Sequence, residues 1–203
     1  MSTFYIDLFL NISYTGFMKK IVLAITGASG VIYGIRFFEY LTNFNISTHV
    51  IISCAGKKVL AIESEIGMNF FKTKGGYLYS EDEIEAPPAS GSWRHDGMVI
   101  CPCSMATLGA IANGCGNNLI HRAADVTLKE GRKLILVIRE MPFNTIHIEN
   151  MLKASRAGAT IFPACPGFYH KPKTILDLVD HVISRILDQL GIENSITPRW
   201  EKN

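Results

Sequence analysis

A glycine-bounded turn near the start of the chain has the residue types of an anion-binding site. Gly27, Ser29 and Gly30 follow an apolar segment, residues 21–26, and precede a segment with a helical pattern, residues 31–41. Backbone N–H groups at a helix N-terminus, at the positive end of its dipole, bind a phosphate or another anion. The glycines let the backbone turn tightly and approach a ligand closely. The turn predicts a nucleotide-binding unit, and the alternative is a tight turn without a ligand.

The spacing of these glycines argues against a dinucleotide. Gly27, Gly30 and Gly34 form the pattern G-x-x-G-x-x-x-G, whereas the dinucleotide fingerprint is G-x-G-x-x-G. That fingerprint also needs an acidic residue after the second strand to hold a ribose hydroxyl. The second predicted strand, residues 48–53, ends in Ser53 and is followed by Cys-Ala-Gly. A ligand without an adenosine ribose, such as a mononucleotide, fits better.

Polar residues also follow two later apolar segments. Ser104 and Thr107 come after residues 98–101 and place hydroxyls at a predicted helix N-terminus, where Ser104 is a candidate cap. Capping alone would explain Ser104, and capping and ligand binding are compatible. Cys101 and Cys103 are one residue apart, but no second cysteine pair supports a metal site, so we interpret them as packing residues.

A charged pair, Arg139 and Glu140, follows the apolar segment 134–138. Charges at the end of a buried strand are costly unless they are paired or used. Arg139 is suited to clamp a phosphate, and Glu140 to transfer a proton in a site shielded from water. The alternative is a mutual or cross-strand ion pair.

A further group of cationic and aromatic residues is spread over the second half of the chain. These side chains would suit an anion pocket, although scattered basic residues are more often solvated. They are Arg122, Lys129, Tyr169, Lys171 and Arg185. Trp200 is an aromatic anchor near the end, suited to cap a pocket or an intersubunit contact.

The elements that must position these residues alternate between strand and helix. Strands are predicted over residues 21–26, 48–53, 98–101, 134–138 and 160–162. Helices are predicted over residues 31–41, 57–66, 104–113, 117–129, 145–156 and 174–190, the last ending at Gly191. Short apolar strands separated by helices predict a three-layer α/β fold, a Rossmann-like (flavodoxin-like) parallel sheet with helices on both faces. Ligands in such folds bind beyond the carboxyl ends of the strands, where the residues singled out above lie.

Composition is that of an ordinary globular protein. The 203 residues are 48% hydrophobic and 19% charged, with a net charge of +2, too small to indicate non-specific nucleic-acid binding. The five cysteines are an odd number in mostly apolar surroundings. They predict buried, reduced thiols of a cytoplasmic protein rather than a disulfide framework.

Residues 1–18 differ from the rest of the chain. Asp7 and Asn11 interrupt an apolar run that lacks a basic start, so the segment is a poor signal peptide and too short to span a membrane. We expect an extra leader that is disordered or reflects a mis-called start, followed by a single flavoprotein domain over residues 19–203. No other segment has the length and hydrophobicity of a membrane span.

Several motifs, taken together and in order, resemble the flavin prenyltransferases of UbiX type. They are ITGASGVIYG (25–34), APPASGS (86–92), MVICPCSM (98–105), NNLIHRAADV (117–126), REMPF (139–143), HIENM (147–151) and PACPGFYH (163–170). The resemblance covers residues 19–200. Many ordered motifs are far more specific than any one of them.

The resemblance implies a reaction. Members of the family join a dimethylallyl group from dimethylallyl monophosphate to N5 and C6 of reduced FMN, without a metal. The product, prenylated FMN, serves a UbiD-type decarboxylase, as in ubiquinone biosynthesis. Departure of the phosphate builds negative charge that basic side chains stabilise, and dry walls protect the cation-like prenyl fragment. The family also forms homo-oligomers, often dodecamers, with sites at subunit interfaces.

The resemblance also implies roles for residues. FMN would be held by Gly27, Ala28, Ser29, Ser53, Ser104, Met105, Ala106, Thr107 and Arg139. Dimethylallyl phosphate would be held, partly across a subunit boundary, by Ser90, Arg122, Lys129, Tyr169, Arg185 and Trp200. Glu140 would act as acid or base, with Ser29 near the reacting edge of the flavin. Ala106 departs from the family pattern, which often has glycine there, and would crowd the flavin slightly.

Two other functions compete with this one. Flavin-dependent cysteine decarboxylases share the general fold, but their P-x-M-N-x-x-M-W segment reads PFNTIH here, at residues 142–147, without Met or Trp. A non-catalytic FMN carrier or chaperone would need no second phosphate pocket and no proton-transferring Glu140.

Overall fold

The structure, a computed structural model, describes residues 19–200. The leader predicted over residues 1–18 lies outside the described residues. Within them, six strands form one parallel sheet in the order β3-β2-β1-β4-β5-β6. The strands are β1 (Lys20–Ile25), β2 (Ser47–Ile52), β3 (Tyr77–Ser80), β4 (Gly97–Cys103), β5 (Leu134–Ile138) and β6 (Thr160–Pro163).

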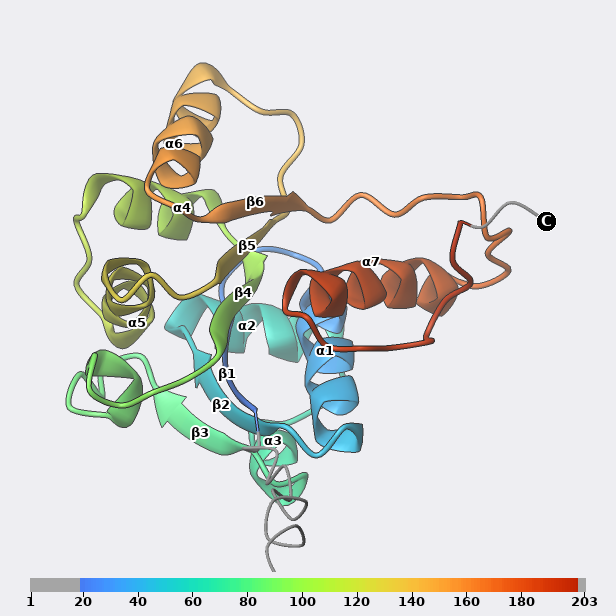
Figure 1. Ribbon diagram of the computed structural model, residues 1–203, viewed down its shortest axis with the longest axis horizontal. Helices are drawn as coiled ribbons and strands as arrows, with labels where there is room; N and C mark the ends of the chain where they lie inside the picture. The colour runs from blue at the N-terminus through green and yellow to red at the C-terminus, as the bar shows by residue number, and fades with distance from the viewer. Residues whose placement is uncertain (1–18, 201–203) are drawn as a thin grey trace, which may run out of the picture.

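Helices cover both faces of this sheet (Figure 1). On one face pack α1 (Val31–Asn43), α2 (Cys54–Glu63), α3 (Asn69–Thr73) and α7 (Ile175–Gln189). On the other pack α4 (Met105–Asn113), α5 (Leu119–Lys129) and α6 (Thr145–Arg156). The central strands are buried on both faces, which explains their continuous apolar runs. The three-layer α/β prediction is confirmed.

The strand order reverses between β1 and β4, so their carboxyl ends open a crevice suited to a ligand. A buried threonine, Thr26, fixes the two ends. Its hydroxyl donates to the Pro102 carbonyl at 2.8 Å and accepts the Ser104 N–H at 2.8 Å. The turns that precede α1 and α4 are therefore tied directly to each other.

Some elements differ from the prediction. Helix α2 begins at Cys54 rather than at residue 57, because the Ser53 hydroxyl caps it by accepting the Gly56 N–H at 2.9 Å. Neither α3 nor β3 was predicted. Strand β3 is a short edge strand with part-exposed side chains, so it lacks the apolar run that marks the inner strands. Gly191 takes a left-handed conformation (φ 63°) just after α7, as predicted for its end.

The expectation of buried thiols holds for only two cysteines. Cys101 and Cys103 lie in the core, and burial raises the pKa of both thiols, that of Cys103 to about 12. They are therefore neutral packing groups. Cys54, Cys115 and Cys165 are exposed, which corrects the prediction, because they lie at a helix start and in loops rather than within strands.

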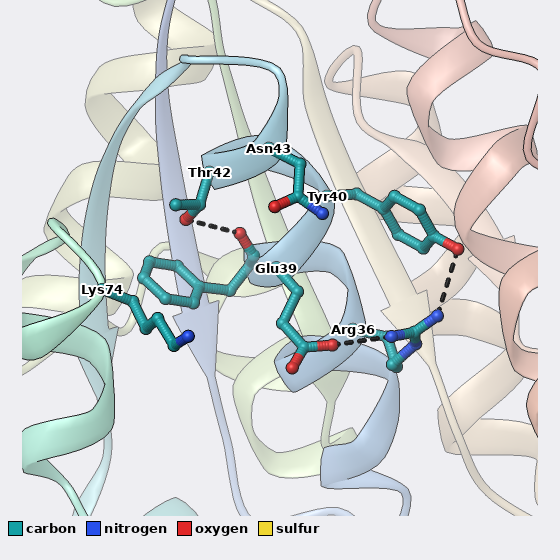
Figure 2. Close-up of a pocket in the computed structure, with 7 residues that line it drawn as sticks. Arg36, Glu39, Tyr40, Thr42, Asn43 and Lys74 are labelled. Carbon is teal, nitrogen blue, oxygen red and sulfur yellow. Dashed lines mark hydrogen bonds and ion pairs between the residues drawn. The ribbon is translucent and has the colours of Figure 1, made fainter.

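A surface hollow of about 230 Å³ on the C-terminal half of α1 is lined by side chains, some of which form hydrogen bonds with one another (Figure 2). Arg36 donates to Glu39 at 2.8 Å and to Tyr40 at 3.1 Å, and it pairs with Asp180 of α7 at 2.8 Å. This end of α1 lies toward the amino ends of the strands. We interpret the network as one that fastens α1 to α7 rather than as a ligand site.

A buried histidine on β2 predicts that the fold loses stability at acid pH. His49 is 6% exposed, stacks on Tyr77 with 4.5 Å between ring centroids, and lies 2.9 Å from the Tyr79 hydroxyl. Burial, followed by the charges of Lys20 and His95, lowers the pKa of His49 from 6.5 to about 4. Between these pH values the unfolded chain binds a proton at His49 that the folded protein does not bind. The free energy of unfolding therefore falls as the pH drops from 6.5 toward 4.

His49→Phe is expected to reduce this pH dependence by up to one proton, or about 1.4 kcal/mol per pH unit. Urea unfolding between pH 7 and 4.5 measures the slope. Tyr79→Phe is the control, because it removes the hydrogen bond but keeps the titrating ring. An unchanged slope in His49→Phe would show that His49 does not titrate in this way.

Candidate functional site

The turn between β1 and α1 requires glycine at two positions. Gly30 has a left-handed φ of 96° immediately before α1. A Cβ on Gly27 would lie 2.5 Å from the Ala55 Cβ, because the first turn of α2 packs closely against this loop. The predicted tight turn is therefore present, and Ala28 is buried beneath it while Ser29 is exposed.

The N-terminus of α1 already binds an anion supplied by the chain itself. The Glu63 carboxylate, at the end of α2, accepts the N–H of Gly30 at 2.7 Å and that of Val31 at 3.1 Å. Burial raises the pKa of Glu63, but hydrogen bonds from Ser29, Gly30 and Val31 and the charge of Arg139 outweigh it, so the net pKa is lowered. Glu63 is therefore ionised at neutral pH.

Sequence reasoning did not identify Glu63. A glutamate on the last turn of a helix is typical of a solvated surface, and nothing in its neighbourhood marks it otherwise. The only available signal was the expectation that an anion would lie at the start of α1. That expectation did not specify that a side chain 33 residues away would supply it.

The N-terminus of α4 differs, because it retains free capacity for a ligand. The Ser104 hydroxyl accepts the Thr107 N–H at 3.3 Å and lies 3.1 Å from the Thr107 hydroxyl, which confirms the predicted cap. The first N–H groups of a helix have no acceptor within it. Those of Met105 and Ala106 therefore point out of the helix end, toward the crevice beyond β4.

Arg139 and Glu140 lie at the same edge of the sheet, after β5. The Arg139 Nε donates to the Ser29 carbonyl at 2.9 Å, which places its guanidinium beside the α1 turn and Glu63. The Glu140 carboxylate accepts the N–H of its neighbour Met141 at 3.0 Å. Among the described residues no ion pair joins Arg139 to Glu140, so the two do not pair with each other, whereas the charge of Arg139 acts on Glu63.

The predicted phosphate-donor residues form two separate groups. In the first, the Arg122 Nε donates to the Ala89 carbonyl at 3.1 Å, beside Ser90. Lys129 lies about two turns further along α5 and pairs with Glu130. A Cβ on Gly91 would lie 2.9 Å from the Lys129 Nζ, so the loop that carries Ser90 packs against the end of α5.

The second group lines a cavity of about 420 Å³ between α7 and the C-terminal segment. Trp200 lies edge-on to Tyr169, with 5.3 Å between ring centroids and an interplanar angle of 90°. Arg185 projects from α7 into the same cavity and pairs with Asp188 at 2.6 Å. The cavity therefore combines a cationic group, a phenol and an aromatic wall.

One chain does not bring these two groups together. Helix α5 packs on one face of the sheet and α7 on the opposite face, as Figure 1 shows. Arg122 and Lys129 are therefore separated by the sheet from Tyr169 and Arg185. Residues 19–200 contain no cluster of three His, Cys, Asp or Glu side chains arranged to hold a metal. The same part of the chain contains no helix long and apolar enough to cross a membrane.

Known proteins resemble this chain over most of its length. The Flavoprotein family matches residues 13–187. The flavin prenyltransferase UbiX of Pseudomonas aeruginosa is 48% identical over 196 residues, covering 90% of this chain and 94% of its own. This chain belongs to the flavin prenyltransferase family. The UbiX of Methanocaldococcus jannaschii is 49% identical, covering 89% and 98% of the two chains. The mitochondrial flavin prenyltransferase PAD1 of Saccharomyces cerevisiae is 46% identical, covering 90% and 76%.

Solved structures place the fold in the same family. The crystal structure of AnUbiX (PadA1) in complex with FMN and dimethylallyl pyrophosphate is 41% identical, with a TM-score of 0.88, and covers 91% of this chain and 98% of its own. A dodecameric FMN-dependent UbiX-like decarboxylase from Escherichia coli O157:H7 has a TM-score of 0.87 at 41% identity, covering 90% and 100%. The peptidyl-cysteine decarboxylase EpiD shares the fold alone, with a TM-score of 0.60 at 18% identity and coverage of 86% and 99%.

The cap at α4 gives a prediction that separates folding from ligand binding. Ser104→Ala removes the acceptor of the Thr107 N–H and is expected to lower the free energy of unfolding of the flavin-free protein by about 1 kcal/mol. Ser104→Asn, which retains a capping oxygen, is the control and should stay within a few tenths of wild type. Urea unfolding measures both. Equal stability of Ser104→Ala and wild type would show that the cap contributes nothing to the fold.

Proposed function

We propose that this protein is a flavin prenyltransferase. It transfers a dimethylallyl group from dimethylallyl monophosphate to N5 and C6 of reduced FMN and supplies prenylated FMN to a UbiD-type decarboxylase. The observation that carries the proposal is the gathering of the predicted flavin-binding residues at the β1–β4 crevice, in a chain 48% identical to a flavin prenyltransferase. We place the enzyme in the cytoplasm, in a pathway such as ubiquinone biosynthesis, with no nucleic-acid or membrane partner.

The residues at this crevice fit FMN. Glu63 accepts the N–H groups at the start of α1, so we expect the phosphate of FMN to bind at the start of α4 instead. There the N–H groups of Met105 and Ala106 and the hydroxyls of Ser104 and Thr107 would contact it. A carboxylate and a phosphate at one helix end would repel each other, whereas two helix ends let both anions bind. Arg139 adds a cation beside the α1 turn.

The flavin ring is then expected to lie along the turn after β1. Gly27, Ala28 and Ser29 offer backbone at close approach, and Ser53 lies at the neighbouring strand end, where the Ser53 N–H donates to the Ile25 carbonyl. The family resemblance would then put Ser29 near the reacting edge of the ring. Reduced FMN, when bound, supplies the electron-rich nitrogen and carbon that accept the prenyl group.

The donor phosphate needs positive charge, because it leaves as an anion. Arg122, Lys129 and Arg185 supply that charge, and Tyr169 supplies a hydroxyl. Side-chain cations of this kind meet the need without a metal, so we propose a metal-independent transferase. Ser90 and Trp200 enclose the prenyl group, because each lies beside one of the cationic groups.

Glu140 is placed to move a proton during the transfer. It follows a fully buried strand and lies half-buried beside Arg139, at the edge where the flavin is expected. A carboxylate at this position can accept the proton released when the new ring forms at C6, and pass it toward the leaving phosphate.

The complete site is expected to form between subunits. The two groups of donor-binding residues lie on opposite faces of one chain, so a neighbouring chain must contribute one of them. We propose a homo-oligomer, a dodecamer as in the UbiX-like structure from Escherichia coli O157:H7. Residues 19–203 act in it as a single flavoprotein domain.

The competing functions account for less of the molecule. A carrier of FMN needs the β1–β4 crevice but not the second set of cations around Tyr169. A cysteine decarboxylase is disfavoured because its characteristic Met and Trp are missing from residues 142–147.

Glu140→Gln separates an enzyme from a carrier. The variant should bind FMN as wild type does but form prenylated FMN at least about a hundredfold more slowly, the usual contribution of a general acid or base. Anaerobic incubation with reduced FMN and dimethylallyl monophosphate, followed by mass spectrometry of the flavin, measures the product.

Met141→Ala is the matched control, because it changes the next, exposed side chain and leaves the carboxylate. Wild-type protein that binds FMN and leaves its mass unchanged would support the carrier instead. Normal turnover by Glu140→Gln would remove Glu140 from the mechanism.

Hybrid oligomers test the shared site. Arg122→Ala and Arg185→Ala proteins should each be inactive alone, since each lacks one half of every donor site. When the two are unfolded and refolded together, interfaces that pair the intact halves should recover up to about a quarter of wild-type activity for random mixing. Refolding each variant alone is the control. No recovery in mixed oligomers would place both arginines in a site built by one chain.

A further inference from the structure

The hydroxyl of Tyr169 is held by a buried histidine that no role has yet explained. His181, on α7, is 7% exposed, and its Nε2 lies 3.1 Å from the Tyr169 hydroxyl oxygen. Its other ring nitrogen, Nδ1, accepts the backbone N–H of Gly167 at 3.2 Å. One imidazole thus connects the helix, the loop that carries Tyr169 and the tyrosine itself.

The partner on Nδ1 fixes the proton on the ring. A backbone N–H can only donate, so Nδ1 of His181 must present its lone pair to Gly167. A neutral imidazole then carries its proton on Nε2 and donates it to the Tyr169 oxygen. With that oxygen acting as acceptor toward His181, the tyrosine O–H is free to donate in another direction. That direction is the cavity shared with Arg185 and Trp200.

We infer that His181 is a positioning residue, which fixes the Tyr169 hydroxyl as a hydrogen-bond donor to the phosphate of the prenyl donor. The inference rests on the proposed function, which assigns this cavity to dimethylallyl monophosphate. It adds the reason why the phenol presents a proton rather than a lone pair to an anion.

The surroundings of His181 keep its ring neutral and in place. The ring of His170 stacks on it, with 4.8 Å between centroids and an interplanar angle of 2°. Both ring nitrogens of His170 are buried and have no hydrogen-bond partner among the described residues. Burial, followed by the charges of His170 and Arg185, lowers the pKa of His181. A protonated ring would also turn an N–H toward Gly167 and lose that bond.

The opposite tautomer would harm binding. With the proton on Nδ1, Nε2 would accept the tyrosine O–H, and the oxygen lone pairs of Tyr169 would face the phosphate. One charge-assisted hydrogen bond would then be replaced by a repulsive contact.

Two substitutions at His181 test the role. His181→Phe keeps a stacked ring but removes both hydrogen bonds, and it should raise the KM for dimethylallyl monophosphate about tenfold, with kcat changed less and the Kd for FMN unchanged. His181→Gln places an amide N–H near the Nε2 position and should restore most of the KM. Val182→Ala, the adjacent core residue on α7, is the control for lost stability alone.

A double-mutant cycle with Tyr169→Phe decides whether His181 acts through the tyrosine. If it does, the double variant should have the same KM as Tyr169→Phe, within about twofold. Independent, multiplying effects, with wild-type turnover intact, would overturn the inference and leave the proposed function standing. No prenylated flavin from wild-type protein would overturn the proposed function itself, and the inference with it.

A spectroscopic measurement keeps the test independent of catalysis and of how the variants fold. In wild-type protein with 15N-labelled histidine, the His181 ring should show the neutral form protonated at Nε2 at pH 7.5, with and without inorganic phosphate. A ring protonated at Nδ1, or at both nitrogens, would overturn the inference.

Discussion

The contact on which the site depends is the pair of hydrogen bonds made by the buried hydroxyl of Thr26. By donating to the Pro102 carbonyl and accepting the Ser104 N–H, it joins the carboxyl ends of β1 and β4 where the strand order reverses. Both strands lead directly into helices, so this side chain, together with the Thr26 N–H that also donates to the Pro102 carbonyl, ties the two turns before the helices to each other. A parallel sheet aligns the strands, but only a contact beyond their ends fixes the turns relative to each other.

The two neighbouring helix N-termini differ in whether their N–H groups already have an acceptor. The α1 end is satisfied by Glu63 from within the chain, whereas the α4 end is capped by Ser104 in a way that leaves outward N–H groups. Arg139 donates to the Ser29 carbonyl in the α1 turn, and its positive charge lowers the pKa of Glu63. The electrostatics of the crevice therefore combine the dipoles of two helix N-termini with two side-chain charges, those of Glu63 and Arg139, which are held by hydrogen bonds to the α1 turn.

The same sheet separates the two groups of residues that we propose bind the prenyl donor. Because α5 and α7 cover opposite faces, the cations on them cannot converge within one chain. The proposed chemistry therefore requires assembly, and the proposed shared site would give the exposed Trp200 a function. The Tyr169–His181 pair also links the interior to this proposed site, because a buried histidine of α7 contacts the hydroxyl of an exposed tyrosine.

The sequence by itself determined the alternation of strand and helix, the tight turn at Gly27 and Gly30, the cap at Ser104 and the family. These follow from local rules: burial on both faces produces apolar strands, and caps and glycine turns are short-range. The edge strand β3 was not predicted from the sequence, because a half-exposed strand has no apolar run.

Only the tertiary structure decided which residues far apart in the sequence contact one another. Glu63 reaches Gly30 across 33 residues, and His181 meets Gly167 and Tyr169 only because the loop folds back onto α7. Such contacts depend on how the chain turns between elements, which sequence spacing does not encode. The separation of Arg122 from Arg185 has the same origin, because the face of the sheet on which a helix packs is set by the path of each crossover.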